Sequence, residues 1–532
     1  MYGLAMRCEQ DWRFHGRGPR FMTFVGALVV ASVGAATGCS FALDKQTEQC
    51  TIDADCVHFG GHPYCRDSVC VASGLGPEGC FAGAPKSQTE YLNACSTSKC
   101  EPFSNCDRLG LCSSDIALPA LTTPMTGVSG SATPVSAPTN LCTDGAPAPT
   151  GTPNMIYLFG SADFGPLLRA AQPSLSALAI PYRAVFQGAS SCAGVSAIFD
   201  VDPALHIMRD PTTETKGGWA FYFDNNGNQV NCRIDPLGTA QPTPGVKIHI
   251  GISNLYSQTC SPALVPGSGV AEYLGPIVPF VLSVPATSSE TSISAEAAHI
   301  VFGSGGKVPQ GGVMKDAAPW TDYNKYYIRN SSSGSTVLTA LLIDVPKTKF
   351  WGIDRLTTDN LRDSLLASTD KSSSIGILSI DFNDKNRGNL KALYLQAKGQ
   401  RCGYLPDSTP TTYDKINVRD GHYPLWGYVH FFTQMVGGLD PAANAMVLLF
   451  NPPKIEQRLV DEIIAASLTP QCAMKVARTS EVGDYIQRPG FQCGCYFDFK
   501  TKGKTDCTSC ASAEDCPGQH PCNYGYCELN DN

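Results

Sequence analysis

Cysteine is distributed unevenly along this chain of 532 residues, and that distribution limits how its parts can fold. Residues 39–112 hold ten of the 24 cysteines and residues 493–532 hold seven, whereas the longer stretch 154–490 holds five. Short polar segments cannot bury enough apolar surface to fold on a core alone, so disulfides have to hold them, and disulfides need an oxidising compartment. The sequence therefore predicts disulfide-linked modules at both ends of an exported protein.

The N-terminus is typical of an export signal. Four arginines precede an apolar run from Phe21 to Ala36, which predicts a signal peptide over residues 1–38. The ending Ala36-Thr37-Gly38-Cys39 resembles a bacterial lipoprotein signal, which implies lipidation of Cys39; ordinary cleavage near Ala36 is the alternative. Loss of Cys8 and acylation of Cys39 leave 24 − 2 = 22 cysteines, an even number that can pair completely.

Composition sets limits on location and partners. The apolar run is too short for a confident membrane span, so we expect an exported body held by lipid in the cell envelope, with the outer membrane favoured. The net charge of −8 gives no basic surplus for binding nucleic acid. A hydrophobic fraction of 43% is enough for a sizeable core.

A cysteine pattern recurs at the two ends. Residues 50–70 read C-x5-C-x8-C-x4-C and residues 510–527 read C-x5-C-x5-C-x4-C, each with an aspartate before the second cysteine (Asp55, Asp515). Residues 95–112 are interpreted as a looser third copy. The pairing of four cysteines is left open among three alternatives. Zinc bound by Cys493, Cys495, Cys507 and Cys510 is the rival to disulfides.

The stretch between 113 and 153 is rich in Pro, Ser, Thr, Ala and Gly, and predicts an unfolded linker that spaces the main domain from the N-terminal modules. The expected domain order is thus signal peptide 1–38, cysteine-rich modules 39–112, linker 113–153, main domain 154–490 and C-terminal module 491–532.

The main domain alternates strand-like and helical patterns. Apolar runs at 155–159, 182–186, 246–250 and 326–329 each lead into a loop of small residues, and three of these loops precede helical spacing. Ser294 predicts an N-cap for a helix over 295–302 that Gly303 closes. This alternation predicts an α/β fold with mostly parallel sheets, in which ligands bind at the carboxyl ends of strands.

These loops resemble those of periplasmic solute-binding proteins, in the phosphate-binding branch. The strongest match is Arg329-Asn-Ser-Ser-Ser333-Gly334-Ser335, followed by the loops at 186–194, 160–164 and 252–254. The resemblance covers about 154–490 and implies two α/β lobes joined by crossing strands, with lobe 1 at about 154–275 and 385–490 and lobe 2 at about 276–384. It implies a ligand in the cleft between lobes, held by Asp163, Phe164, Ser191, Asn254, Arg329, Ser333, Gly334 and Ser335.

The chain departs from that family at three positions. The family's threonine in the first loop is Asp163 here, its acid after the third strand is Asn254, and its acid two residues after the arginine is Ser331. Acceptors for a protonated oxyanion are therefore changed, and a carboxylate buried beside an oxyanion is repulsive unless a proton or cation intervenes. A different oxyanion, a neutral polar solute or no ligand at all stay open.

Five of the site residues also have a structural alternative: Arg329 in a surface ion pair, and Ser191, Ser333, Ser335 and Asp163 as helix caps. The histidines show no metal spacing, no enzyme motif is present, and neither an enzyme activity, a metal nor a cofactor is expected. The sequence favours a lipid-anchored envelope protein that binds a small polar or anionic solute. The alternative is a surface structural or adhesion protein with a degenerate cleft and an envelope protein as partner.

Overall fold

The computed structural model describes residues 50–56, 64–66, 68–71, 80–112, 117–124, 136–212, 218–267, 269–310, 313–435, 437–452, 454–488 and 492–528. The described residues all lie in one compact unit, Glu48–Asn532. The predicted signal peptide and Cys39 lie outside the described residues. In the described part, no helix combines the length and the apolar character that crossing a bilayer requires.

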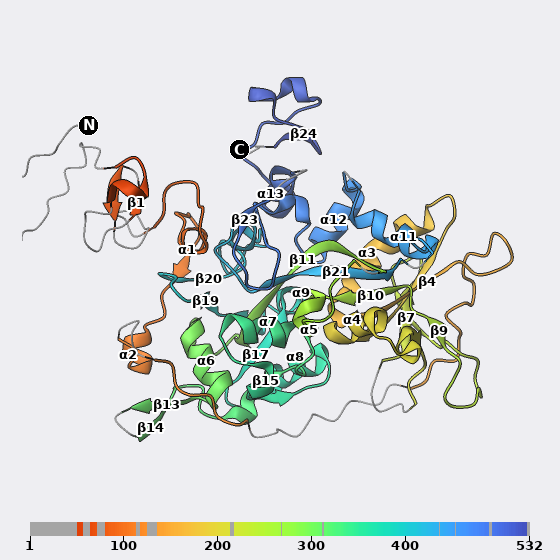
Figure 1. The fold of residues 1–532 in the computed structure, drawn as a ribbon, viewed down its shortest axis with the longest axis horizontal. Helices are drawn as coiled ribbons and strands as arrows, with labels where there is room; N and C mark the ends of the chain where they lie inside the picture. The colour runs from red at the N-terminus through yellow and green to blue at the C-terminus, as the bar shows by residue number, and fades with distance from the viewer. Residues whose placement is uncertain are drawn as a thin grey trace, which may run out of the picture. The chain divides into compact units, whose positions relative to one another are not determined.

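Two long antiparallel strands run through the centre of the main sheet (Figure 1). Strand β11 (Val270–Pro285) pairs with β21 (Trp426–Gln434) along most of the length of β21, with an irregularity between Leu274 and Ile277. From Gly275 onward every residue of β11 is buried, which its composition of Val, Ile, Leu, Phe and Pro favours. These two strands join the two halves of the sheet, as expected from the resemblance.

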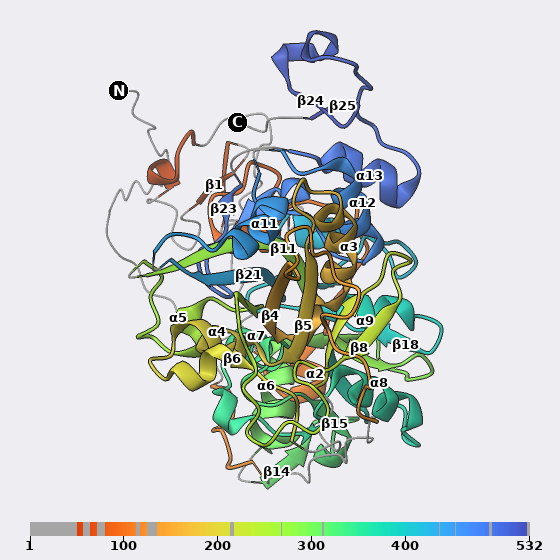
Figure 2. The same ribbon diagram turned by 90° about the vertical axis from the view of Figure 1, so that its right-hand side faces the viewer.

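The first half of the sheet lies beyond β21. Strands β10, β4 and β5 are parallel to one another. On the outer side of β5, strand β7 pairs with it antiparallel, and β7 and β8 form a hairpin. Helix α3 packs on β5, and α4 packs on β4 and β10 (Figure 2). The bounds are β4 Met155–Ser161, β5 Arg183–Ala189, β7 Ala220–Phe223, β8 Gln229–Cys232, β10 Ile250–Ser253, α3 Gly165–Ser176, α4 Ser191–Phe199, α11 Pro441–Phe450 and α12 Gln457–Ala465.

The second half lies on the other side of β11. Strands β17, β15 and β16 are parallel, and β17 and β18 each pair antiparallel with the far end of β11. Residues 390–404, which the resemblance placed with lobe 1, belong to strands that pair here and with β12. The bounds are β12 Ser292–Ser294, β15 Tyr326–Ile328, β16 Ile353–Asp354, β17 Ile375–Ser379, β18 Leu390–Ala392, β19 Tyr394–Gln396, β20 Gly403–Tyr404, α6 Ala295–Ser304, α7 Gly334–Leu342, α8 Thr358–Ala367 and α9 Ile380–Lys385.

The α/β prediction is confirmed, with one refinement. Strands β10, β4 and β5 are parallel, and so are β17, β15 and β16. The pairs β5–β7 and β7–β8 and every pair made by the crossing strands are antiparallel, so the sheet as a whole is mixed. The strand predicted at 246–250 is split, because residues 246–247 form β9, which pairs with β6 (Ile207–Met208), and the sheet strand is β10. Helix α6 is capped by Ser294 as predicted, but it ends two residues later, at Gly305 with a left-handed φ of 64°.

The end modules share one disulfide pattern, in which the first cysteine pairs with the third and the second with the fourth. In both modules the repeated aspartate accepts hydrogen bonds from backbone amides three and four residues earlier, and a short hairpin follows. The internal repeat therefore holds at the level of structure. The pairs are Cys50–Cys65, Cys56–Cys70, Cys510–Cys522 and Cys516–Cys527.

The predicted third copy is wrong. Cys100 pairs with Cys402 of the main domain, and strand β3 (Cys100–Glu101) pairs with β20. The remaining pairs also break the repeat: Cys80–Cys95 and Cys106–Cys112. Residues 80–112 are thus fixed to the second half of the main domain, because a covalent bond and a strand pair join them.

The predicted spacer role of the linker is wrong for its described parts. Thr122 donates its amide to the carbonyl of Gly303, and Cys142 forms a disulfide with Cys232 at the end of β8. A segment without a core of its own is therefore held by contacts with the main domain. Cys192–Cys260 and Cys472–Cys493 are the disulfides that lie within the main domain or at its C-terminal edge.

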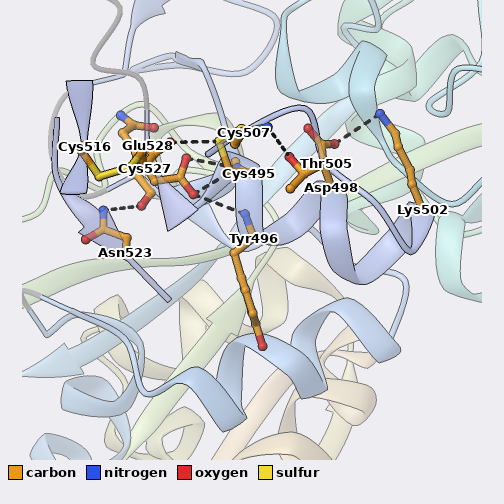
Figure 3. Close-up of a disulfide and its surroundings, with 12 residues drawn as sticks. Cys495, Tyr496, Asp498, Lys502, Thr505, Cys507, Cys516, Asn523, Cys527 and Glu528 are labelled. Atoms are coloured by element: carbon orange, nitrogen blue, oxygen red, sulfur yellow. Dashed lines mark hydrogen bonds and ion pairs between the residues drawn. A yellow bond between two sulfur atoms is a disulfide. The ribbon is translucent and has the colours of Figure 1, made fainter. Parts of the chain in front are cut away.

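The C-terminal module is fixed at the start of helix α13 (Gly494–Lys502) (Figure 3). The Glu528 carboxylate accepts hydrogen bonds of 3.0 Å from the Cys495 amide and 3.3 Å from the Tyr496 amide, where a helix start has unpaired N–H groups. Cys495 pairs with Cys507. The four cysteines of the zinc alternative, in residues 493–510, are therefore all taken up by three disulfides, Cys472–Cys493, Cys495–Cys507 and Cys510–Cys522.

Non-reducing peptide mapping should recover the first-to-third and second-to-fourth pairs in both end modules. A chelator should leave the thermal unfolding midpoint unchanged, whereas a reductant should lower it, because disulfides rather than a metal close these loops. Loops of about 15 residues contribute about 3 kcal/mol each. Neighbouring pairs such as Cys510–Cys516, or loss of folding with a chelator, would contradict the assignment.

Candidate functional site

Five strand ends deliver polar residues to one place between the two halves of the sheet. The parallel strands β5, β4 and β10 end side by side, so the loops that carry Ser191, Asp163 and Asn254 follow at the same edge. Strand β15 leads to Arg329 and the serine loop at 330–335, and β17 leads to Asp381. We refer to these loop residues together as the loop cluster.

Hydrogen bonds join the three loops of the first half. The Asn254 side-chain amide donates to Asp163 Oδ2 at 2.8 Å, and the Asn254 backbone amide donates to Ser191 Oγ at 3.2 Å. Ser161 Oγ lies 3.4 Å from Asp163 Oδ2. Ser190 caps helix α4 by accepting from the amide of Ala193, which leaves Ser191 at the first helical position. The structure therefore brings Asp163, Ser191 and Asn254 together.

The serine loop of the second half meets them directly. Cys192 donates its amide to the carbonyl of Ser332 at 3.2 Å, and the hydroxyls of Ser332 and Ser190 are 2.9 Å apart. Gly334 lies so close that a Cβ there would be 2.7 Å from Ser191 Oγ and 2.9 Å from Asn254 Cβ. Only glycine fits this approach, so the two halves are in a closed arrangement at this point.

Ser333 and Ser335 form a second, smaller group in the same loop. Their hydroxyl oxygens are 3.0 Å apart, and both side chains are buried. Ser333 precedes helix α7 without capping it through its side chain. The cap alternative therefore fails for Ser333 and for Ser191, whereas Ser190, one residue before the predicted Ser191, is the cap of α4.

Arg329 is the buried cation of the cluster. Its side chain is 8% exposed, and one terminal nitrogen donates to Thr358 Oγ1 at 2.8 Å. Its Nε has no hydrogen-bond partner, and no described carboxylate forms a direct ion pair with it. Burial lowers the pKa of Arg329, and the charge of Asp163 opposes that shift. The surface ion pair considered from the sequence is thus not what the structure has.

Asp381 is a member of the cluster that the sequence did not single out. Its carboxylate accepts from Ser379 Oγ at 2.7 Å and from Lys385 Nζ at 3.3 Å, and its side chain is 1% exposed. Burial raises its pKa. The sequence could have indicated Asp381, because this aspartate lies two residues after the apolar strand Ile375–Ser379.

The pKa of Asp163 is raised from its ordinary value of 3.8 to about 6. Burial is the largest cause and repulsion by Asp381 the second, whereas Arg329 and hydrogen bonds from Ser379 and Ser161 lower it. The partly buried carboxylate of Asp163 can accept a hydrogen bond when ionised and donate one when protonated. Its proton therefore changes what the cluster can bind.

Phe164 differs from the other predicted site residues. Its ring is fully buried and packs edge-on against Phe186 at 5.5 Å and Phe431 at 5.8 Å. The side chain therefore belongs to the hydrophobic core of the first half, and only its backbone is left to serve the site.

A pocket of about 1060 Å³ borders the cluster at Arg329 and Asp381. Its other walls are the first turns of α3 and α4, the β7–β8 hairpin and the start of α8. In the described chain, three cysteines also lie close together in each end module. Disulfides rather than a metal explain both groups, which are Cys50, Cys56 and Cys70, and Cys510, Cys516 and Cys527.

No protein-family model matches the sequence, and a search of curated proteins gives no match. Similar solved structures include a putative phosphate ABC transporter substrate-binding protein with bound phosphate from Clostridium perfringens, at 11% identity and a TM-score of 0.39, covering 60% of this chain and 99% of that one. An ABC-type phosphate transport receptor from Vibrio cholerae gives 11% and 0.36, covering 60% and 100%. A phosphate-binding protein from Stenotrophomonas maltophilia gives 12% and 0.34, covering 60% and 90%. The fold assignment here rests on the strand order described above.

Replacing Asp163 by Asn should raise stability at high pH. Because the pKa in the folded state is above the ordinary value near 3.8, the stability that Asp163 contributes is full below about pH 4 and is lost as pH rises through about 6. Asp163→Asn should match the wild type near pH 4 and exceed it at pH 8 by on the order of 2 kcal/mol. Urea unfolding measured across this range checks it, with Asp363→Asn on the exposed face of α8 as the control. A difference that does not change with pH would contradict the shift.

Replacing Gly334 by Ala should separate the two halves at the cluster. The new Cβ would meet Ser191 and Asn254 at under 3 Å, so the closed arrangement should lose about 1–3 kcal/mol. Gly388→Ala is a matched control, because a Cβ there has nothing within 4 Å. Small-angle scattering and thermal unfolding check the prediction. Equal behaviour of the two variants would show that Gly334 is not a contact of the closed state.

Proposed function

We propose that this protein is an exported, non-enzymatic solute-binding protein that holds a small oxyanion in the loop cluster between its two lobes. The observation that carries the proposal is Arg329, a guanidinium that is 8% exposed and has an Nε without a hydrogen-bond partner. Burying a cation without an ion-pair partner costs free energy, and an anion that pairs with the cation offsets that cost. The guanidinium fork suits the paired oxygens of an oxyanion.

The groups around Arg329 support an oxyanion rather than an apolar ligand. Ser191, Ser333 and Ser335 supply hydroxyls, and the first turns of α4 and α7 supply backbone amides where the helix dipole favours negative charge. Asn254 Oδ1 is buried and has no hydrogen-bond partner in the described structure. That oxygen could accept from a hydroxyl of a protonated ligand.

The acceptor carboxylate that the resemblance places at Asn254 has a counterpart close by. Asp163 Oδ2 is 2.8 Å from the side-chain nitrogen of Asn254, so the negative charge is displaced across one hydrogen bond. With a pKa raised to about 6, Asp163 ionises near neutral pH and then accepts from a protonated oxyanion. Phosphate is therefore one fitting ligand among oxyanions that carry a proton.

Binding would work by closure of the lobes. Arg329 and the serine loop come from one half, while Asp163, Ser191 and Asn254 come from the other, so a ligand between them contacts both. The strands β11 and β21 are the connections that would bend. A ligand stabilises the closed state only as far as its contacts with both halves exceed those it makes in the open state.

Lipid anchoring through Cys39 is part of the proposal. The 22 cysteines from Cys50 to Cys527 form eleven disulfides, so none of them in that range is left for Cys39 to pair with. This agrees with the count from the sequence, in which Cys39 is acylated after the signal peptide is removed. The protein would then be held at a membrane surface of the cell envelope.

A structural or adhesion protein with a degenerate cleft is the second proposal. The charge of Asp163 acts on Arg329, and the halves already touch through Ser190, Cys192 and Ser332. The chain's own carboxylate would then take the place of a ligand. The repeated end modules would supply the surface for an envelope partner.

Thermal unfolding of the mature chain with phosphate, sulfate and arsenate separates the two proposals. A ligand at about 100 times its dissociation constant adds about 2.7 kcal/mol, and Arg329→Gln should remove that gain. Arg108→Gln, which removes an arginine that pairs with Glu290 outside the pocket, should keep it. The absence of stabilisation by any of the three ions would reject the oxyanion proposal and favour the second one.

A further inference from the structure

The pocket next to Arg329 is far larger than one tetrahedral ion needs. Its volume of about 1060 Å³ is slightly above the range of about 300–1,000 Å³ that holds organic ligands of drug size. Because Arg329 and Asp381 line this pocket as well as belonging to the loop cluster, a ligand bound at Arg329 has room to extend outward. The size of the pocket therefore points to an anion that carries an organic body.

One end of the pocket favours negative charge. Arg329 is nine-tenths buried there, with its partnerless Nε, and Thr358 at the start of α8 binds its terminal nitrogen. The first turn of α8 and that of α4 both face the same pocket. Acidic side chains on this side are already engaged, since Asp381 pairs with Lys385 and Asp359 with Arg362.

Another wall of the pocket is the face of the β7–β8 hairpin. In its register Phe221 lies opposite Asn231, and Phe223 lies opposite Gln229, so two rings and two amides share one face and line the pocket. The rings stand edge-on to each other at 5.8 Å, and Gln229 donates to Asn231 Oδ1 at 3.1 Å. The two amide side chains are exposed and already held in place.

This wall suits a hydroxyl-rich body. Side-chain amides can both donate to and accept from hydroxyl groups, while aromatic faces pack against the C–H face of a ring. Arg169, exposed on α3, lines the same pocket, with its Nε 3.1 Å from where a Cβ on Gly227 would lie. It adds a second cation that no described carboxylate ion-pairs. The acidic Glu462 on α12 also lines the pocket and is exposed to solvent.

We propose that the ligand is a phosphate monoester of a polyhydroxy compound, with its phosphoryl group at Arg329 and its hydroxyl-bearing body against Phe221, Phe223, Gln229 and Asn231. This inference rests on the proposed function, because it keeps the oxyanion at the same arginine. It differs from the proposed function because the phosphoryl group makes only some of the contacts, and the hydroxyl-bearing body makes the others. The hairpin wall, which the sequence did not single out, then determines specificity.

Calorimetry on the mature chain with its disulfides intact tests the ligand class. The probes are inorganic phosphate, glucose, and a panel of glucose 6-phosphate, ribose 5-phosphate and glycerol 3-phosphate. At least one monoester should bind about tenfold or more tighter than inorganic phosphate, since its hydroxyl-bearing body adds hydrogen bonds that the ion alone cannot make. Glucose should bind more weakly than its phosphate, because it lacks the charged group.

Variants test which part of the ligand contacts Arg329 and which part contacts the β7–β8 hairpin. Gln229→Ala and Phe223→Ala should each lower affinity for the best monoester about fivefold or more and leave affinity for inorganic phosphate within about twofold. Arg329→Gln should lower both. Gln258→Ala on α5 (Ser257–Cys260) and Phe499→Ala on α13 are matched controls outside the pocket, and both should behave as the wild type.

The outcomes separate this inference from the proposed function. Binding of inorganic phosphate as tight as that of every monoester, or monoester affinity unchanged in Gln229→Ala and Phe223→Ala, would overturn the inference and leave the oxyanion site standing. Binding of no phosphate compound at all would overturn both. Tight binding of glucose without phosphate would overturn both the role of Arg329 and the ligand class.

Discussion

The antiparallel ladder between β11 and β21 is the constraint on which the rest of the main domain depends. One end of β11 pairs with β21 next to the strands that carry Asp163 and Asn254, and its other end pairs with β17 and β18. Because both halves grow outward from this one ladder, the carboxyl ends of their parallel strands face the same gap. The loop cluster is a consequence of that arrangement, and residues far apart in sequence meet there without a local motif.

Disulfides stabilise the segments that lie outside the hydrophobic core of the main domain. In their described residues, the two repeated modules form short hairpins and single turns, and the buried apolar side chains there are largely the cysteines themselves. Cys100–Cys402 is different, since it closes a separation of 302 residues and fixes residues 80–112 to the main domain. In the chain-entropy account such a long loop restricts the unfolded state more than a short one, although only logarithmically.

Local patterns predicted the parts of this fold that local physics determines. Apolar runs marked β4, β5 and β15, and Ser294 was found as a cap, since both depend on neighbours in sequence. What failed depended on distant contacts. Spacing placed Cys100 in a third copy of the repeat, but its partner is Cys402, and composition read 113–153 as a spacer although Cys142 pairs with Cys232.

The site shows the same division. The resemblance brought together loops that do meet in the structure, but it could not show that the ring of Phe164 faces the core, that Asp381 joins the cluster, or that the β7–β8 hairpin forms a wall. Each of these follows from packing of one element on another. Side-chain direction at a loop is set by such packing and not by the residue types in the loop.

The position of the carboxylate, at Asp163 rather than at Asn254, has a consequence for the proposed ligand selectivity. If the proposed function holds, a site with one buried arginine, the buried carboxylate of Asp381 and the partly buried one of Asp163 would favour a ligand whose own charge can adjust by a proton. When Asp163 is ionised it repels a fully charged oxyanion but accepts from one that keeps a proton, and when it is protonated it donates to either form. Because its pKa is raised to about 6, this change falls close to the second ionisation of phosphate monoesters, near 6. Under the proposed function, site and ligand would share a proton in the range where both titrate, and sulfate esters, which carry no such proton, would gain nothing from that carboxylate.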